Sequence, residues 1–494
     1  MLRSLASLAS LASLGLFSMP CILSAERVPP NIILILADDL GYSDLACYGN
    51  DRNQSPHLDQ MAREGQRWTE FYSASHICSP SRAALLTGLY PVRTGTDAHV
   101  FFEWSAEGLP HDSVTLAEVL KENGYRTYCI GKWHLGHKDG YLPIDQGFDY
   151  FYGIPYSNDM RVDPDMKVAD TVVFREGMTE DGMRDHANKI DNWIPLMEGD
   201  ALIEYPADQN TLTRRYTEQS LTCIAQSIEE KTPFFLFIAH HLPHVPIFVS
   251  DSIQSTVSGN SYAQAIAEID ASVGQILAYL KASALADNSL VIFTSDNGPD
   301  QTFNLQGGRA EPLKGSKFYA SEGGQKVPTL FWWPNKIPTG EIDALGSTLD
   351  IYNTALSLAG ISDASKQATD SYDLSPVLFH QSESPRKDFY YFSSFIEPRG
   401  QIYAVRKGDW KAHFYQSQSP EYYNPKSIVK HPKAKLYNLK EDPGENTDLA
   451  DTFPHIVKDL EKHSEAFSKD IQRSIAPNRY SKKILHQVRP DWAQ

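Results

Sequence analysis

The sequence is poor in cysteine. Only five cysteines occur among the 494 residues, at positions 21, 47, 78, 129 and 223. A single bridge among Cys47, Cys129 and Cys223 stays open, because Cys21 lies in an N-terminal leader and Cys78 in a motif described below. These three match no zinc-binding spacing and no disulfide framework. The cysteine content therefore excludes a small fold held together by several disulfides.

Basic residues are outnumbered as well. The chain has 45 Lys and Arg against 62 Asp and Glu, which gives a net charge of −17 at pH 7. Such an acidic chain argues against nucleic acid as a partner. Hydrophobic residues make up 41% and charged residues 22% of the chain, as in ordinary globular proteins with a sizeable core. The length suggests roughly two to four domains.

Beyond its N-terminus, the sequence lacks an apolar run long enough to span a bilayer. At the N-terminus, Arg3 precedes an Ala/Leu/Ser-rich stretch that reaches Phe17, and Leu23-Ser24-Ala25 offers a cleavage site. This order is typical of a secretory signal peptide, which we place at residues 1–25. It predicts a secreted or periplasmic protein. The alternatives are a lipid anchor at Cys21, which follows a poor lipobox, and an uncleaved anchor.

Four apolar runs predict buried strands of a parallel sheet, and polar residues follow each run. The runs and their polar ends are Asn31–Ala37 with Asp38-Asp39, Gly124–Ile130 with G-K-W-H-L-G, Phe234–Ala239 with H-H-L-P-H, and Leu290–Ser295 with Asp296-Asn297. In α/β sheets, ligands gather at the carboxyl ends of such strands. Taken singly, these ends could be an Asp-Asp turn, a surface K-x-H, a three-histidine zinc site or an Asn-Gly hairpin. Lys132 and His134 would share one face if the chain is extended there.

Helical spacing fills the intervals between these strands. We expect helices at His57–Gly65, Val114–Asn123, Thr211–Glu230, Tyr262–Leu280 and Leu349–Gly360. In the fourth of these helices, Glu268 and Asp270 should be exposed. Weak periodicity between Arg161 and Asn210 predicts a loop-rich insertion over the pocket. From about Arg386 the pattern changes to short strands followed by a helix near Ile456–Phe467.

The most informative stretch is Cys78-Ser79-Pro80-Ser81-Arg82, which Leu86-Thr87-Gly88 follows at a short distance. Pro80 has a fixed φ and no N–H, so it suits the first turn of a helix. Arg82 would lie one turn further on. This C-x-P-S-R…L-T-G pattern resembles the signature of the type I sulfatases. In that family the cysteine is oxidised to formylglycine, whose hydrate is the nucleophile.

Other segments strengthen the resemblance. Gly131–Gly136 (G-K-W-H-L-G) is similar to the second sulfatase signature, and P-H-x-P favours His244 over His241. Lys317, followed by Glu322-Gly323-Gly324, matches the family's G-x-K…E-G-G element, with Lys314 as a competing match. Phe318 stands where the family usually has glycine. Gly153–Ser157 and Lys411–Phe414 resemble the arylsulfatase A group of the family.

The resemblance implies an α/β fold of the alkaline-phosphatase type. This fold has a mixed sheet between helices and a smaller C-terminal antiparallel-sheet subdomain. We place the catalytic domain at residues 26–385 and the C-terminal subdomain and tail at 386–494. The implied activity is hydrolysis of sulfate monoesters of a sulfated saccharide or glycolipid, with aryl sulfates as surrogate substrates.

The resemblance also implies a role for individual residues. The catalytic set is Cys78, Arg82, Lys132, His134, His244 and Lys317. Ser157 and His413 would contact substrate, although His413 could equally be a packing residue. One Ca²⁺ would be held by Asp38, Asp39, Cys78 (as formylglycine), Asp296 and Asn297. These oxygen donors suit Ca²⁺ better than Mg²⁺ and argue against zinc.

In the implied reaction, one hydroxyl of the hydrate attacks sulfur, and His244 or Lys317 protonates the leaving oxygen. His134 then takes the proton of the second hydroxyl as sulfate leaves. Maturation would require a formylglycine-generating enzyme or its equivalent. A sulfated substrate is an anion, so the site must be locally positive within an acidic protein.

Two other functions stay open. One is a formylglycine-dependent phosphodiesterase or phosphonate hydrolase. The other is a non-catalytic protein that binds sulfated glycans and whose Cys78 is never oxidised.

Overall fold

A large mixed sheet forms the centre of the protein. The computed structural model describes residues 28–185, 190–361, 370–393, 399–417 and 428–479. The predicted signal peptide and Cys21 lie outside the described residues. The five central strands of the sheet run parallel and are, in spatial order, β10 (Ser289–Ser295), β1 (Asn31–Ala37), β9 (Phe234–Ala239), β4 (Arg126–Lys132) and β5 (Tyr150–Ile154). These strands confirm the four buried strands predicted from apolar runs.

Shorter strands widen the sheet to eleven on its two sides. Beyond β10 come β11 (Thr329–Trp332), β2 (Gln66–Trp68) and β12 (Gly340–Ile342). Beyond β5 come β7 (Leu196–Glu198), β8 (Ala201–Tyr205) and β6 (Val168–Phe174). The prediction of a loop-rich insertion between Arg161 and Asn210 is therefore wrong for the segments that form these three strands, because they extend the sheet. Each is short or half exposed, so its apolar pattern is weak.

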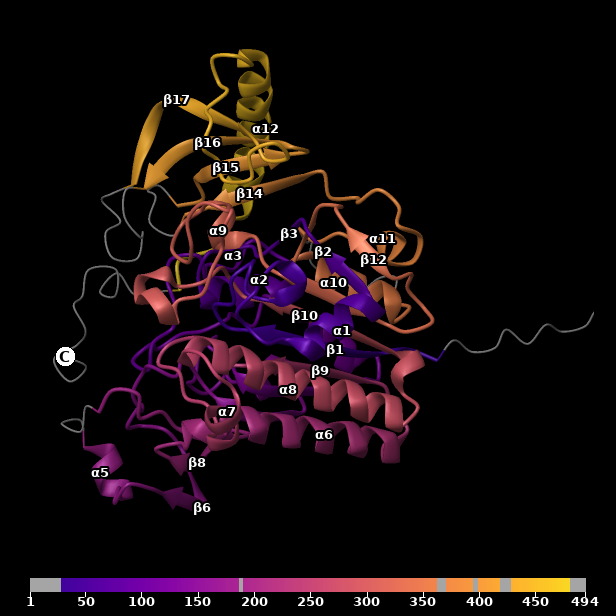
Figure 1. Cartoon of the computed structure of the whole chain (residues 1–494). Coiled ribbons are helices and arrows are strands. Elements are labelled where there is room, and N and C mark those ends of the chain that lie inside the picture. Colours follow the sequence, from indigo (N-terminus) through magenta and orange to yellow (C-terminus); the bar gives the residue numbers. More distant parts are fainter. Residues whose placement is uncertain (1–27, 186–189, 362–369, 394–398, 418–427, 480–494) are drawn as a thin grey trace, which may run out of the picture.

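Helices cover both faces of this sheet (Figure 1). Figure 1 shows α6 (Leu212–Glu230) and α8 (Ser261–Ala282) on one face. On the opposite face lie α2 (Cys78–Thr87) and α10 (Asp350–Leu358), with α4 (Leu116–Glu122) packed against them. The helix α1 (Pro56–Glu64) contacts α8 and β11. Shorter elements are β3 (Phe71–Tyr72), α3 (Pro91–Thr94), α5 (Glu180–Arg184), α7 (Asp251–Thr256), α9 (Glu322–Gln325), β13 (Gly346–Ser347) and α11 (Ser375–His380).

The prediction that Glu268 and Asp270 are exposed on α8 is wrong. Both side chains are buried. Glu268 accepts a hydrogen bond from the backbone N–H of Ser250, and Asp270 accepts two from the backbone N–H groups of His57 and Leu58 at the start of α1. They are buried because other segments of the chain pack beside α8. The periodicity of the helix sequence does not predict which segments these are.

The C-terminal region forms a separate four-stranded antiparallel sheet. Its strands lie in the order β14 (Asp388–Phe392), β15 (Ile402–Lys407), β16 (Trp410–Ser417) and β17 (Ile428–Asn438), and α12 (Pro454–Ser474) packs on them. Aromatic side chains of β14 contact Tyr72 and Tyr90 of the large domain. The buried Arg386 pairs with Asp350 at 2.6 Å across the same interface. These layers confirm the predicted fold class.

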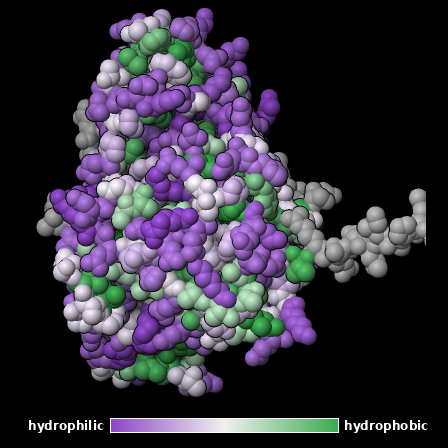
Figure 2. Space-filling model, turned by 45° about the vertical axis from the view of Figure 1, so that its right-hand side comes forward, coloured by the Kyte–Doolittle hydropathy of each residue, from purple (hydrophilic) through white to green (hydrophobic). Residues whose placement is uncertain are grey.

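The surface carries no extended apolar region on the face seen in Figure 2, where hydrophobic residues form small groups among hydrophilic ones. Within the described residues, no helix combines the length and the hydropathy that a bilayer crossing requires.

Candidate active site

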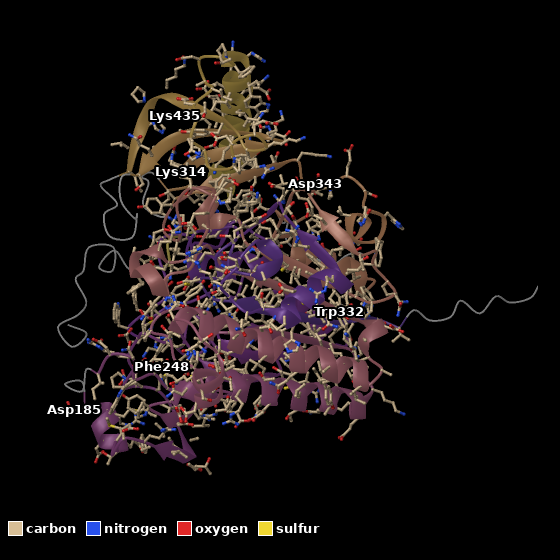
Figure 3. All side chains as sticks on the ribbon, in the orientation of Figure 1. Asp185, Phe248, Lys314, Trp332, Asp343 and Lys435 are labelled. Carbon is tan, nitrogen blue, oxygen red and sulfur yellow. The ribbon has the colours of Figure 1, made fainter. Side chains whose placement is uncertain are left out.

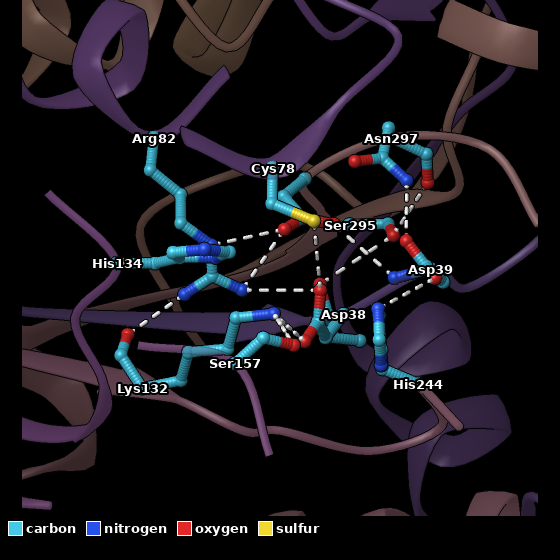
Figure 4. Close-up of polar contacts among 12 residues, drawn as sticks. Asp38, Asp39, Cys78, Arg82, Lys132, His134, Ser157, His244, Ser295 and Asn297 are labelled. Carbon is cyan, nitrogen blue, oxygen red and sulfur yellow. Dashed lines mark hydrogen bonds and ion pairs between the residues drawn. The ribbon is translucent and has the colours of Figure 1, made fainter. Parts of the chain in front are cut away.

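The carboxyl ends of β1, β4, β9 and β10 bring the predicted polar residues together (Figure 4). Asp38 follows β1, Lys132 ends β4, His244 lies five residues after β9, and Asp296 follows β10. Because the four strands are parallel neighbours, these ends meet at one edge of the sheet. The readings as separate surface turns are thereby excluded.

Cys78 is the first residue of α2, a helix that is buried along its whole length. Its thiol sulfur lies 3.6 Å from Asp38 Oδ1. The next residue, Ser79, donates a hydrogen bond of 2.7 Å to the carbonyl of His134, which ties the two signature motifs to each other. Burial raises the pKa of the Cys78 thiol well above its usual value. The N-terminus of α2 points toward the site, and a helix N-terminus favours negative charge.

Arg82 is fully buried and fixed by carboxylates. Its Nε and Nη2 each lie 2.9 Å from Asp296 Oδ2, and Nη2 lies 3.5 Å from Asp38 Oδ1. Its Nη1 donates to the carbonyl of Lys132 at 2.7 Å. The guanidinium is therefore held in one orientation, with its charge beside Cys78.

Two lysines and a histidine complete a ring of basic side chains. Lys132 Nζ lies 2.5 Å from Asp38 Oδ2 and donates to Ser157 Oγ at 3.1 Å. Lys317 Nζ lies 2.7 Å from Asp39 Oδ2, and His244 Nε2 lies 3.6 Å from the same oxygen. Lys317, and not the competing Lys314, thus reaches the site. Lys314 is exposed and donates to the carbonyl of Glu445.

His134 lies beside Arg82 in the same cluster (Figure 4). His134 was predicted to lie on the same side as Lys132 because the chain would be extended there. The two residues do lie in one cluster, but the chain is not extended at His134. β4 ends at Lys132, and His134 has a φ of 62°. Burial, Lys132 and Arg82 hold the pKa of the imidazole well below its usual value, so the ring is neutral at pH 7 and can accept a proton.

The cluster formed by Asp38, Asp39, Asp296 and Asn297 offers oxygen ligands that fit a hard divalent cation. Burial and the neighbouring Asp38 raise the pKa of Asp296 to about 7, as expected where carboxyl groups are confined together away from water. Asn297 donates from Nδ2 to Asp39 Oδ1 at 2.6 Å, while its Oδ1 is buried without a hydrogen-bond partner. A cation with oxygen ligands would relieve both features.

A three-histidine zinc site is not formed. In the described part of the chain, the side-chain groups that could hold an ion are Asp38, Cys78 and Asp296, and Asp39, Cys78 and His244. His240 and His241 belong to neither group. Burial lowers the pKa of these two rings to about 4 and about 3. The open question of a disulfide also closes, because Cys47, Cys129 and Cys223 are free thiols.

The two predicted substrate residues differ in position. Ser157 lies within the cluster, against Lys132. His413 lies on β16 and contacts Glu445 at 2.6 Å and the rings of Tyr403 and Tyr437. Its part in substrate binding stays a prediction.

Several supporting residues were not predicted from the sequence. Ser73 and Ser81 both donate to the carbonyl of Asp296, and Ser295 accepts from the N–H of Leu40. Ser81 stands inside the C-x-P-S-R motif, so the motif itself was the available signal. Ser73 and Ser295 carry no motif, since only the folded chain brings them to Asp296 and Leu40.

Comparison with known proteins supports this arrangement. The family model "Sulfatase" matches residues 30–361, and "C-terminal region of aryl-sulfatase" matches residues 384–491. Arylsulfatase A of Homo sapiens is 36% identical over 448 residues, covering 88% of this chain and 87% of that protein. N-acetylgalactosamine-6-sulfatase of Homo sapiens is 34% identical over 487 residues, covering 90% of this chain and 87% of that protein.

Among solved structures, Ps i-CgsB in complex with k-i-k-neocarrahexaose is similar with a TM-score of 0.76 and 28% identity. That similarity covers 92% of this chain and 96% of the solved one. The shared architecture is the alkaline-phosphatase-like fold.

Proposed function

Because the chain belongs to the sulfatase family and is a sulfuric ester hydrolase, we propose that it cleaves sulfate monoesters of a sulfated saccharide or glycolipid. The names of its relatives support a saccharide substrate, since one acts on N-acetylgalactosamine 6-sulfate groups and one was solved with a neocarrahexaose. Aryl sulfates would serve as surrogate substrates.

The observation that carries the proposal is the surrounding of Cys78. Cys78 lies beside Asp38, Arg82 and the two lysines of the site. Burial nevertheless keeps its thiol protonated at pH 7. A neutral thiol is a weak nucleophile. We therefore propose that Cys78 is oxidised to formylglycine, whose hydrate supplies one hydroxyl to attack sulfur and a second hydroxyl whose deprotonation re-forms the aldehyde and expels the sulfate.

The other residues bind charge and move protons. Lys132, Lys317 and His244 would hold the sulfate oxygens, and Ser157 orients the Lys132 ammonium. Lys317 or His244 would donate a proton to the leaving oxygen. The neutral imidazole of His134 would accept a proton from the side chain at position 78. Little covalent help is available for such a transfer, so positioning and charge stabilisation carry most of the acceleration.

Asp38, Asp39, Asp296 and Asn297 would hold one Ca²⁺, together with an oxygen at position 78. The ion would supply positive charge beside the nucleophilic oxygen. The described site brings three carboxyl groups together with three cations, Arg82, Lys132 and Lys317. The bound dication would leave the site positive, as an anionic substrate requires.

We further propose that residues 1–25 direct export to a secreted or periplasmic location, and that a formylglycine-generating enzyme or its equivalent oxidises Cys78. The catalytic domain would comprise residues 26–385, and the C-terminal subdomain and tail residues 386–494.

Two measurements test the proposal. Mass spectrometry of the active protein should show the aldehyde at position 78, which is lighter than the thiol because oxygen replaces sulfur. The protein should hydrolyse para-nitrophenyl sulfate faster than an aryl phosphodiester with the same leaving group. An unmodified thiol in fully active protein contradicts the mechanism, and a large phosphodiester preference contradicts the substrate class.

A panel of defined sulfated saccharides would then identify the substrate. Release of sulfate from none of them, with aryl sulfate turnover intact, would point to the glycolipid instead.

A further inference from the structure

The segment that carries Lys317 is a closed turn. The N–H of Gly323 donates to the carbonyl of Lys314 at 2.8 Å, which joins the two ends of residues 314–323. Within the turn, the N–H of Lys317 donates to the carbonyl of Pro299 at 2.9 Å, and the N–H of Phe318 donates to that of His76 at 3.1 Å. The position of the Lys317 ammonium is therefore set by how this turn is held.

The turn also packs directly on the segment that carries Asp296 and Asn297. A Cβ atom at Gly298 would lie 1.9 Å from the carbonyl oxygen of Gly323, and one at Gly323 would lie 2.2 Å from that of Gly315. The backbones are thus too close for any side chain at these glycines. A displacement of the turn would therefore move both Lys317 and the segment that carries Asp296 and Asn297.

The C-terminal sheet contacts the end of this turn through the buried ammonium group of Lys411. Lys411 of β16 is fully buried, and its Nζ lies 2.9 Å from Glu322 Oε1 and 2.9 Å from Glu445 Oε1. The ammonium also lies 3.8 Å from the centre of the Tyr391 ring. Glu445 Oε2 accepts from the backbone N–H of Glu322 at 3.2 Å. Figure 3 shows Lys314, at the start of the turn, just below the C-terminal sheet that bears Lys435.

Further hydrogen bonds hold Glu322 in the same place. Tyr391 donates to Oε1 at 2.6 Å, and Tyr72 donates to Oε2 at 2.5 Å. Burial raises the pKa of both carboxyl groups, but Lys411 together with the other neighbouring basic side chains outweighs it, so the pKa of Glu322 and of Glu445 is lowered and both are ionised. Taking one partner away from such a group leaves a buried charge unpaired.

We propose that Lys411 and Glu445 of the C-terminal subdomain are positioning residues, which hold Glu322 and thereby fix the turn that presents Lys317 to the leaving oxygen of the substrate. The inference rests on the proposed function, in which Lys317 is one of the two candidate proton donors. The C-terminal subdomain would then contribute to catalysis without touching the reacting atoms.

A leaving-group comparison separates this role from general stabilisation. Phenyl sulfate needs protonation of its leaving oxygen more than para-nitrophenyl sulfate does, because nitrophenolate is the more stable anion. We expect Lys411→Met to lower kcat for phenyl sulfate by about tenfold more than for para-nitrophenyl sulfate, as a misplaced proton donor would. Glu445→Gln should show the same selectivity more weakly, and it serves if Lys411→Met does not fold. Lys411→Arg, which keeps the charge, should restore part of the loss.

The matched control is Arg386→Met. Arg386 and Asp350 form an equally buried ion pair between the same two domains, without contact to residues 314–323. This variant should lose thermal stability as Lys411→Met does, with equal effects on the two sulfates. Equal effects on the two sulfates from folded Lys411→Met or Glu445→Gln protein would overturn the inference.

A double-mutant cycle with Lys317→Ala tests whether Lys411 acts through Lys317. If Lys411 acts through Lys317, adding Lys411→Met to Lys317→Ala should change kcat little further. Multiplicative losses would overturn the inference and leave the proposed function standing. If Lys317→Ala itself shows no leaving-group dependence, Lys317 is not the proton donor, and both its proposed role and the inference fall.

Discussion

At the residue scale, the proposed chemistry depends on one buried side chain. Cys78 contacts Asp38 and sits among three cations, but its pKa is raised and not lowered. Reactive thiols usually have the opposite shift, produced by nearby positive charge and exposure. Desolvation outweighs the lysines here. The site therefore does not activate the thiol, which supports the proposal that Cys78 acts in its oxidised form.

We expect Cys78→Ala to reduce kcat for para-nitrophenyl sulfate by several orders of magnitude, because the nucleophile is lost. The variant should fold normally, since alanine fits the start of α2 with little change in packing. Circular dichroism and steady-state kinetics check both statements. Cys223→Ala, on α6, is the control and should keep its activity. Comparable turnover in the two variants would refute the assignment.

The side-chain oxygen Oδ1 of Asn297, which is buried without a hydrogen-bond partner, leads to a second prediction. Removing Ca²⁺ with a chelator should abolish turnover and lower the melting temperature, because binding to the folded state alone adds stability. Adding Ca²⁺ back should restore both. Asn297→Ala should need a higher Ca²⁺ concentration for half-maximal activity, while the exposed Glu229→Ala should not. Activity that survives complete removal of the ion would exclude the calcium site.

At the element scale, α1 depends on another helix for its N-terminus. Its own N-cap residue, Ser55, makes no side-chain capping bond. Asp270 of α8 supplies the missing acceptors, at 2.7 Å from the N–H of Leu58 and 3.2 Å from that of His57. A carboxylate at this point also faces the positive end of the helix dipole.

Asp270→Ala should therefore lower the free energy of unfolding by roughly 1–3 kcal/mol, as two backbone N–H groups lose their partner. Asp270→Asn keeps an acceptor oxygen and should lose less. Urea unfolding monitored by tryptophan fluorescence gives the comparison. If the alanine and asparagine variants are equally stable, the capping bonds contribute nothing measurable.

The elements themselves were largely predictable. The strands β1 and β9 are nearly pure apolar runs, and β10 has an apolar run at its centre; burial on both faces of a parallel sheet favours that pattern. The strands β6, β7 and β8 escaped prediction because they lie at the sheet's edge with mixed exposure. The residues that gather at the site were predictable for another reason, since they stand in motifs that resemble the sulfatase signatures. Asp270 and Glu322 were not given their roles, because their partners are chosen only by the folded chain.

At the scale of the whole molecule, two opposite charge distributions coexist. The chain carries a net charge of −17, while Arg82, Lys132 and Lys317 gather at the site. A sulfated saccharide, the proposed substrate, would be repelled at long range and attracted only close to the site. Salt screens exposed charges beyond a Debye length of about 10 Å at 0.1 M, but it screens buried pairs much less.

For this reason kcat/KM for a multiply sulfated oligosaccharide should rise as KCl increases from about 10 mM to about 100 mM. The same range should change kcat/KM for para-nitrophenyl sulfate less, because that substrate carries a single charge. Sucrose at matched osmolarity is the control and should have no such effect. A steep fall with salt would mean that the substrate is guided in by surface cations, and that the acidic exterior does not govern encounter.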